Sequence, residues 1–327
     1  MRIGIDIGGT KCAVVKGETV NGAFSVTGRV CFETERRTPT EVLSRFDDAI
    51  NDFVMTAAGS AKVGEGVIES IGISCGGPLD SVRGVILSPP NLPGWDHIEI
   101  VRHFKERFGV PTALENDANA CALAEWRYGA GRGTKNMIFL TFGTGLGAGL
   151  ILNGALYGGT NGMAGEVGHI RLNAFGPAGY GKCGSFEGFC SGAGIAAFAR
   201  EMAREARQRG ISPCYAPADG TPFSAKDVAE AARRGDDTAL KVMRICGEQL
   251  GAGLAILMDI LNPEAIVIGS IFARSRDLLW EHAERVIHAE ALEQSRAVCR
   301  VTAAELGEQI GDYAALAVAE AALSGRV

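Results

Sequence analysis

Three polar residues, Glu115, Asn116 and Asp117, stand where a short apolar run gives way to a strong helix-forming segment. A carboxylate at the junction of a strand and a helix N-terminus is held by backbone on both sides. A carboxylate held in this way can act as a general base. An Asn-Asp pair at such a position is also typical of a simple helix cap. The local pattern therefore leaves both roles open for Asp117.

Two glycine turns lie between predicted strands, one near the start of the chain and one near its middle. Glycines let backbone N–H groups approach a phosphate closely, and a carboxylate at a strand end can hold Mg²⁺ through water. The residues of these turns that we expect to bind a nucleotide are Asp6, Gly8, Gly9, Thr10, Lys11, Gly143, Thr144 and Gly145. A tight hairpin with an incidental Asp would give the same local pattern at the first turn. The similarity of the two turns suggests a duplicated architecture.

The composition limits the class of protein. A chain of 327 residues exceeds the length of about 150 residues that is usual for one domain, so we expect two lobes with a cleft between them. A hydrophobic content of 46%, a net charge of −6 and the lack of any long basic run predict a globular protein that does not bind nucleic acid. Nine irregularly spaced cysteines are expected to be reduced thiols. The chain has neither a leader-like start nor an apolar run of membrane-spanning length, so we expect a cytoplasmic location and no membrane partner.

Hydrophobic periodicity and turn signals place the main elements. Helices are predicted over residues 40–58, 118–128, 193–209, 225–234, 236–261 and 311–323, and strands over residues 68–75, 137–142, 265–269 and 298–303. Three prolines predict that residues 85–95 form a stiff loop, with no helix or central strand, that presents Asn91 and Trp95. Such a loop can clamp a ligand or serve only as a connection.

Several ordered motifs together resemble the ROK family of sugar kinases and related proteins, within the actin and hexokinase superfamily. These motifs are IDIGGTK, GGPLD, PNLPGW, ENDANACALAE, FGTGLGAGLIL, AGEVGH and EGFCSG. The resemblance implies an α/β fold with two actin-like (ribonuclease H-like) lobes and a duplicated core around a central cleft. It places the N-terminal lobe at residues 1–115, joined by the C-terminal helix at 305–327, and the C-terminal lobe at residues 116–304.

The resemblance also implies roles for individual residues. Asp117 resembles the family's catalytic base, ATP and Mg²⁺ are the implied cofactors, and Asp6 would organise the Mg²⁺. The residues that resemble sugar contacts are Gly76, Gly77, Asn91, Asn116, Glu166, His169 and Glu187. Gly269 resembles the first residue of the family's adenosine-binding Gly-Gly turn, with Ser270 in the second place. These polar side chains are also suitable partners for sugar hydroxyls.

One segment departs from the family pattern. The family commonly carries a zinc motif, Cys-x-Cys-Gly-x-x-Gly-Cys-x-Glu, after the His of GEVGH. Anchored on Glu187, the segment here is interpreted as lacking the first cysteine and a later Gly-Cys pair, so that only Cys183 is left, with Cys190 a stray candidate. These cysteines and His169 have the wrong spacing for a closed tetrahedral site, and no structural zinc is expected. Phe186 and Phe189 are expected to fix the loop by packing.

The leading hypothesis is an ATP-dependent kinase that phosphorylates the 6-hydroxyl of a hexose, with glucose as the first choice. N-acetylmannosamine, N-acetylglucosamine, fructose, allose and a β-glucoside remain alternative acceptors. A hypothesis of a different class is a sugar-sensing ROK regulator, but regulators of the family carry a helix-turn-helix before the first glycine turn, and here Asp6 follows Met1 closely. The resemblance further implies a homodimer or a larger homo-oligomer.

Overall fold

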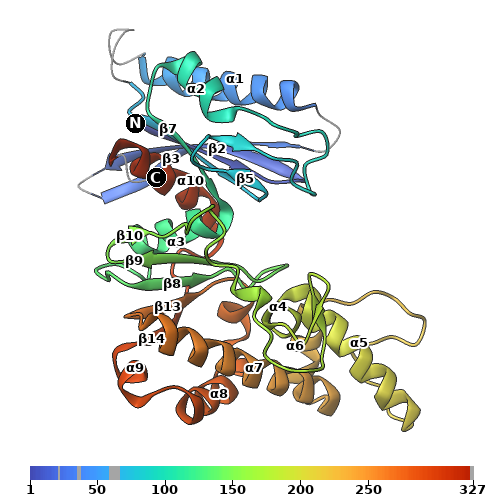
Figure 1. Cartoon of the computed structure of the whole chain (residues 1–327). Coiled ribbons are helices and arrows are strands. Elements are labelled where there is room, and N and C mark those ends of the chain that lie inside the picture. The colour runs from blue at the N-terminus through green and yellow to red at the C-terminus, as the bar shows by residue number, and fades with distance from the viewer. Residues whose placement is uncertain (21–22, 35–37, 59–66, 325–327) are drawn as a thin grey trace. The chain divides into compact units, whose positions relative to one another are not determined.

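The computed structural model describes residues 1–20, 23–34, 38–58 and 67–324 (Figure 1). Contacts divide the chain into two compact units. Unit 1 contains Met1–Gly133, Gly154–Gly162 and Leu306–Val327, and unit 2 contains Thr134–Asn153 and Met163–Glu305. The lobe boundaries expected from the sequence remain a prediction. Among the described residues, no helix has the length and apolar character that a membrane span requires.

The sheet of unit 1 brings three strand ends to one edge. Its order is β3 (Ala23–Glu33), β2 (Lys11–Val20), β1 (Arg2–Ile7), β4 (Ser70–Cys75) and β7 (Thr112–Asn116). Strand β1 is antiparallel to β2 and parallel to β4, and β4 is parallel to β7. Ile7 lies opposite Cys75, and Cys75 lies opposite Asn116. The segments that follow these three strands therefore begin side by side at the carboxyl edge, where ligands of open α/β sheets usually bind.

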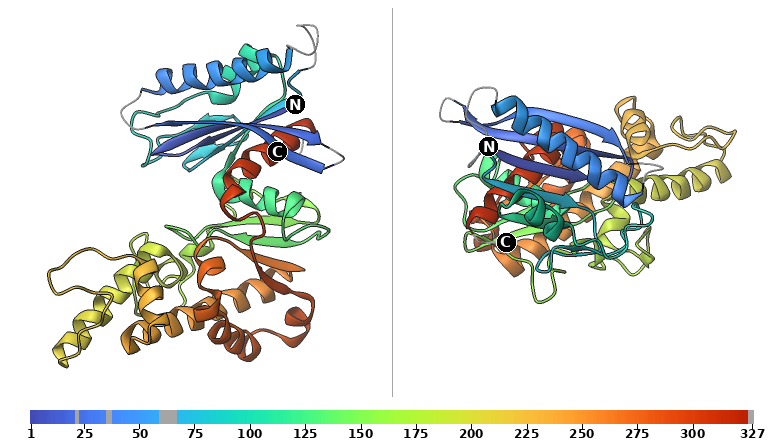
Figure 2. Two further views of the ribbon diagram at one scale, coloured as in Figure 1. Left: turned by 180° about the vertical axis from the view of Figure 1, so that it is seen from behind. Right: turned by 90° about the horizontal axis from the view of Figure 1, so that it is seen from above.

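Helices cover both faces of this sheet (Figures 1 and 2). Helices α1 (Pro39–Ala58) and α2 (Ile100–Phe108) lie on one face, and α10 (Ile310–Ser324) packs on β1 and β4 on the other face and against α3 (Asp117–Tyr128). The small side chains of Ala314, Ala315 and Ala317 are fully buried and let α10 approach the sheet closely. The predicted helices at 40–58, 118–128 and 311–323 are confirmed, whereas α2 was not predicted. The remaining elements of unit 1 are β5 (Leu79–Asp80), β6 (Val85–Ile86), β10 (Ala155–Leu156) and η2 (Gly307–Gln309). The prediction that the loop over residues 85–95 presents Trp95 is wrong, because this large apolar side chain is buried in the hydrophobic core.

Unit 2 repeats the combination of a mixed sheet with helices. Its five-stranded sheet has the order β10, β9 (Ala148–Leu152), β8 (Met137–Leu140), β13 (Ala265–Ile268) and β14 (Arg300–Ala303). Strands β8 and β13 are parallel, with Leu140 opposite Ile268. Helices α7 (Asp237–Leu261) and α8 (Ile271–Glu290) pack against each other on one face of the sheet (Figure 1). The other elements are η1 (Val167–His169), β11 (Ala178–Gly179), β12 (Lys182–Cys183), α4 (Phe186–Phe189), α5 (Gly192–Gln208), α6 (Ala225–Arg233) and α9 (Glu293–Val298).

The predicted elements of unit 2 are confirmed with small shifts at their ends. Strand β8 stops at Leu140 instead of residue 142, and β14 begins at Arg300 because the preceding residues form α9. Helix α8 was not predicted, and its backbone is non-helical at Ser275. Phe186 and Phe189 are buried, as expected. Both units have the α/β composition that the sequence predicts.

Candidate functional site

The junction between β7 and α3 has the predicted geometry. Strand β7 ends at Asn116, whose side chain caps the helix by accepting a 3.0 Å hydrogen bond from the Ala118 N–H. The Asp117 carboxylate accepts a 2.8 Å bond from the same N–H, and Asp117 is exposed. This second bond holds the Asp117 carboxylate in place. Because Asn116 already caps the helix, Asp117 is not required for the start of α3.

The neighbouring Glu115 has a structural role. Its side chain is buried and accepts hydrogen bonds of 2.9 Å from the Asn119 side chain and from the Asn116 N–H. Burial raises the pKa of Glu115 above its ordinary value. Glu115 therefore supports the junction from inside the unit, while Asp117 faces solvent.

Predicted sugar contacts of unit 1 gather beside the first glycine turn. A Cβ added to Gly9 would lie 2.4 Å from the Asn91 carbonyl oxygen, so this close approach requires glycine. A Cβ on Gly76 would lie 3.8 Å from the Asn91 amide nitrogen, and one on Gly77 would lie 3.6 Å from the Asn116 amide nitrogen. The amide groups of Asn91 and Asn116 therefore meet the Gly76-Gly77 turn at the carboxyl edge of the sheet.

Asp6 lies in a concentration of negative charge at this same edge. Burial, followed by the charges of Asp312 and Asp117, raises its pKa to about 6 against the lowering effect of the charges of Arg29 and Lys11. The Arg29 Nε donates to both carboxylate oxygens of Asp312, at 3.0 and 2.9 Å. Asp312 and Arg29 were missed in the sequence, because no local motif marks them and only the packing of α10 brings Asp312 to Asp6.

The residues around Asp6 are better suited to Mg²⁺, which is bound partly by water and substrate, than to a metal ion that is bound only by protein side chains. Among the residues that the structure describes, no group of three or more His, Cys, Asp or Glu side chains is placed to hold a metal ion. Protein-bound Mg²⁺ usually keeps several waters and takes one or two carboxylates together with substrate phosphates. The raised pKa of Asp6 shows that an added positive charge would be stabilised there. Asp6 is therefore the residue that would hold Mg²⁺.

The predicted acceptor contacts of unit 2 gather around the second glycine turn. The Glu187 carboxylate accepts a 3.0 Å hydrogen bond from the Leu146 N–H. A Cβ on Gly168 would lie 2.3 Å from the Leu146 carbonyl oxygen and 3.2 Å from the Glu187 Cβ. The exposed residues Glu166 and His169 flank Gly168 in the turn that contains η1. The Glu187 side chain and the turn that carries Glu166 and His169 thus both lie against the loop that follows β8.

A cavity of about 600 Å³ opens beside the same loop. Three helices begin at this cavity, because its lining includes Ala193 of α5, Lys226 of α6 and Ile271 of α8, together with Thr144. Helix N-termini are favourable places for phosphate groups. The sequence indicated Gly143, Thr144 and Gly145 as nucleotide contacts, but it did not indicate the N-termini of α5 and α6 among them. The Ser224-x-x-Asp227 capping box was a signal in the sequence for the start of α6.

The wall of this cavity contains two arginines in fixed positions. Arg233 forms a two-pronged ion pair with Asp277, with both contacts at 2.8 Å. Arg274 donates a 3.0 Å hydrogen bond to the Ser270 hydroxyl. Ser270 has a φ of 50°, a conformation that favours glycine. The turn after β13 therefore keeps a glycine-like backbone at Ser270 although the residue is serine.

The segment before Glu187 requires a correction to the alignment expected from the sequence. Residues 178–183 form a hairpin whose turn is Tyr180-Gly181. Counting back from Glu187 through this hairpin without a gap puts Ala178, Tyr180 and Ser185 at the three cysteine positions of the family motif. The motif's two glycines then match Gly181 and Gly184. The expectation of a deletion and of Cys183 as a remaining ligand was wrong, because it ignored this gap-free match.

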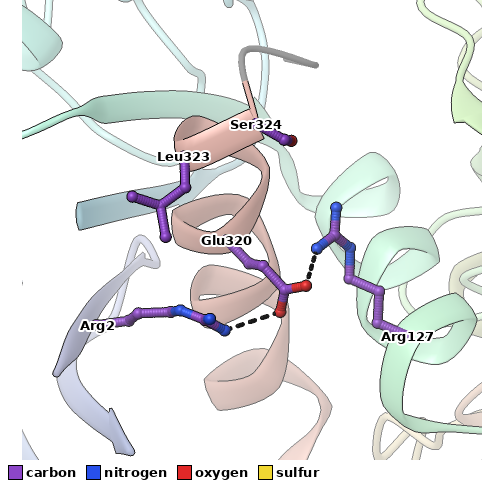
Figure 3. Close-up of a pocket in the computed structure, with 5 residues that line it drawn as sticks. All are labelled: Arg2, Arg127, Glu320, Leu323 and Ser324. Atoms are coloured by element: carbon purple, nitrogen blue, oxygen red, sulfur yellow. Dashed lines mark hydrogen bonds and ion pairs between the residues drawn. The ribbon is translucent and has the colours of Figure 1, made fainter. Parts of the chain in front are cut away.

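A second cavity, of about 450 Å³, lies in unit 1 beside an ion-pair network (Figure 3). Glu320 of α10 pairs with Arg2 at 2.9 Å and also with Arg127, and it accepts a hydrogen bond from Tyr128. Arg2 in turn lies 3.4 Å from Glu69, so two cations face two anions. This network joins β1, α3 and α10 and so helps to position the helix that begins at Asp117.

Comparisons with known proteins agree with this geometry. The ROK family model matches residues 2–322. A glucokinase from Streptomyces coelicolor is 32% identical over 95% of each chain. The crystal structure of a ROK family glucokinase from Streptomyces griseus in complex with glucose and AMPPNP matches 98% of this chain and 99% of that chain, with 32% identity and a TM-score of 0.70. A ROK family transcriptional regulator matches with 25% identity and a TM-score of 0.81 over 99% of this chain and 78% of that one. The predicted actin-like α/β fold is confirmed, and the chain belongs to the ROK family.

Proposed function

We propose that the chain is an ATP-dependent sugar kinase that transfers the γ-phosphoryl group of ATP to a hydroxyl of a hexose. The observation that carries this proposal is the grouping of Asp6, Asn91, Asn116 and Asp117 at the carboxyl edge of one sheet. An exposed carboxylate, two amide groups and a carboxylate suited to Mg²⁺ are the groups that phosphoryl transfer to an alcohol requires. The glucokinases among the matched relatives support the same reaction.

In the proposed reaction, Asp117 accepts the proton of the acceptor hydroxyl as that oxygen attacks the γ-phosphorus. Asn91, Asn116, Glu166, His169 and Glu187, with the Gly76-Gly77 turn, bind and orient the sugar. Thr10, Lys11 and Thr144 contact the phosphates, together with the backbone amides of both glycine turns, and Gly269 lies toward the adenosine. Mg²⁺ supplies charge neutralisation at the phosphoryl oxygens when it is bound.

The proposed acceptor is glucose, and the proposed position is its 6-hydroxyl. The support is the identity of about one third to glucokinases over nearly the whole chain. N-acetylmannosamine, N-acetylglucosamine, fructose, allose and a β-glucoside present the same primary hydroxyl with different groups elsewhere on the ring. They are therefore the informative competitors.

An assay of ADP release over this panel tests the proposal. Each sugar is added to the protein with ATP and Mg²⁺, and the background without sugar is subtracted. We expect glucose to give the highest kcat/KM. If no sugar in the panel raises ADP release above background, the kinase proposal is wrong. If another sugar is the best acceptor, only the choice of glucose is wrong.

A sugar-sensing regulator is the second candidate, because a transcriptional regulator is among the matched structures. The same panel separates the two functions when it is combined with thermal unfolding. A sugar that raises the melting temperature without any release of ADP would support a sensor, whereas both effects together support a kinase. The expected homo-oligomer and cytoplasmic location remain predictions, and sedimentation analysis tests the first.

A further inference from the structure

The loop before Glu187 contains a serine, Ser185, whose hydrogen bonds hold its shape. Ser185, at the third cysteine position, is fully buried. Its hydroxyl oxygen accepts hydrogen bonds from the Gly179 N–H at 3.2 Å and from the Gly188 N–H at 3.1 Å. One side chain thereby joins the first strand of the hairpin to the short helix that carries Glu187.

Backbone pairing connects the same loop to the segment after His169. The Phe186 N–H donates to the Ile170 carbonyl at 2.8 Å, and the Leu172 N–H donates to the Gly184 carbonyl at 2.9 Å. Arg171 donates to the Cys183 carbonyl at 2.7 Å. These bonds keep the His169 segment and the Glu187 segment together without a shared metal.

The side chains that would have to bind zinc do not fit a metal site. The rings of His169 and Tyr180 lie 5.6 Å apart, so an aromatic ring stands where the motif has its second cysteine. Cys183 is exposed, whereas Cys190 is buried and its thiol donates to the Cys246 carbonyl at 3.7 Å. Because Tyr180 is 88% exposed, its contact with His169 is weak, and the buried Ser185 is the main connection.

We propose that this chain has replaced the family's zinc site by a hydrogen-bonded loop in which Ser185 positions Glu187. The loop keeps the spacing of the motif, with left-handed backbone at Tyr180, Gly181 and Gly184. Because the spacing is kept, we expect cysteines introduced at 178, 180 and 185 to restore a four-ligand zinc site together with His169. The proposal rests on the proposed function only for the role of Glu187 as an acceptor contact.

Zinc content and thermal unfolding test the structural part of the proposal without any activity assay. The wild-type protein, purified from zinc-supplemented medium, should contain substoichiometric zinc and keep its melting temperature in a chelator. The variant A178C/Y180C/S185C should bind about one zinc per chain and lose thermal stability in the chelator. The matched control, the same variant with His169→Ala, should bind zinc more weakly. Stoichiometric zinc in the wild type, or a folded triple variant that binds none, would overturn the proposal.

Sugar kinetics test the positioning role of Ser185. Ser185→Ala removes the acceptor of two N–H groups, and we expect it to raise the KM for the acceptor sugar by about tenfold while kcat changes less. The zinc-loaded triple variant also lacks the Ser185 hydroxyl, but its acceptor KM should be closer to that of the wild type than the KM of Ser185→Ala is. A general effect on folding would not give this difference. An unchanged acceptor KM in a folded, active Ser185→Ala protein would contradict the positioning role. If the wild type itself is inactive on every sugar, the proposed function fails, and the zinc measurements still stand.

Discussion

Glu187 and Leu146 connect the predicted acceptor site of unit 2 to its predicted phosphate turn. The Glu187 carboxylate accepts a 3.0 Å hydrogen bond from the Leu146 N–H, which belongs to the loop after β8. A carboxylate that binds this backbone has a fixed orientation toward any sugar that it contacts. A change in the glycine turn should therefore affect the binding of the acceptor sugar as well as the binding of ATP.

Gly145→Ala should disturb Glu187 directly. A Cβ at this position would lie 2.9 Å from the Glu187 Oε2 atom, and the flexible carboxylate can move away only by weakening its bond to Leu146. We expect a loss of about 1 kcal/mol, or roughly a fivefold rise in the KM for the acceptor. Steady-state kinetics with varied sugar at saturating ATP measure it. Gly158→Ala, where a Cβ would meet only the Gly162 Cα at 3.9 Å, is the matched control and should keep the wild-type KM. Equal KM values in the two variants would refute the coupling.

Asp117→Asn should separate binding from chemistry. Asn keeps the shape of the side chain but cannot accept a proton at neutral pH, so kcat should fall by roughly 10²–10⁴-fold. Because Asn116 caps α3, stability should change by at most about 1 kcal/mol. Calorimetric titration should find sugar affinity close to that of the wild type. Phosphorylation at the wild-type rate by this variant would exclude Asp117 as the base.

Asp6 should make the free energy of unfolding depend on pH. Its pKa is raised from 3.8 to about 6 in the folded protein, so between these values the folded state binds more protons than the unfolded state. The stabilising effect of protonated Asp6 is complete below pH 3.8 and is lost as the pH rises through about 6. The shift corresponds to at most roughly 3 kcal/mol, and partial exposure of Asp6 reduces it to about 1–2 kcal/mol.

Urea unfolding between pH 4 and pH 7.5 measures this effect in the wild type and in Asp6→Asn. The variant should lack the loss of stability on raising the pH through about 6, and at pH 7.5 it should be the more stable protein. Mg²⁺ with an ATP analogue should lower the apparent pKa of Asp6 in the wild type. The same pH dependence in both proteins would show that Asp6 is not the titrating group.

Asp312→Asn should shift the pH dependence that Asp6 produces. The charge of Asp312 raises the pKa of Asp6, so its removal should lower that pKa and move the acid limb of kcat/KM to lower pH. The Arg29 Nε keeps only one of its two acceptor oxygens in this variant, and the positive charge of Arg29 is no longer balanced by a carboxylate, which acts in the same direction. A pH profile of ADP release measures the limb. A shift to higher pH would contradict the arrangement of charges.

Glu125→Gln should destabilise unit 1 from its interior. Glu125 is fully buried, and its carboxylate accepts bonds from the Ala130 N–H at 2.8 Å and from the Leu306 N–H at 2.9 Å. A Gln amide can replace only one of these acceptors, so we expect a loss of about 1–3 kcal/mol in the free energy of unfolding. Glu290→Gln makes the same change at an exposed position and should stay within about 0.5 kcal/mol of the wild type. Equal stability of the two variants would mean that these bonds contribute nothing.

The sequence by itself determined the features that depend on neighbouring residues. The strand before Asn116 and the helix after it follow from a local change of pattern, and the glycine turns at Gly8 and Gly143 follow from backbone requirements within a few residues. The alanine-rich pattern of residues 311–323 likewise predicted a helix, because alanine has a high helix propensity.

Only the tertiary structure decided which distant residues meet. Asp312 and Arg29 influence Asp6 because α10 and β2–β3 pack around β1, and the cavity beside Thr144 exists because α5, α6 and α8 begin at one place. The hydroxyl of Ser185 became important only when the hairpin brought Gly179 to it. Contacts of this kind depend on the paths of whole elements, and no short stretch of sequence contains the distances that create them.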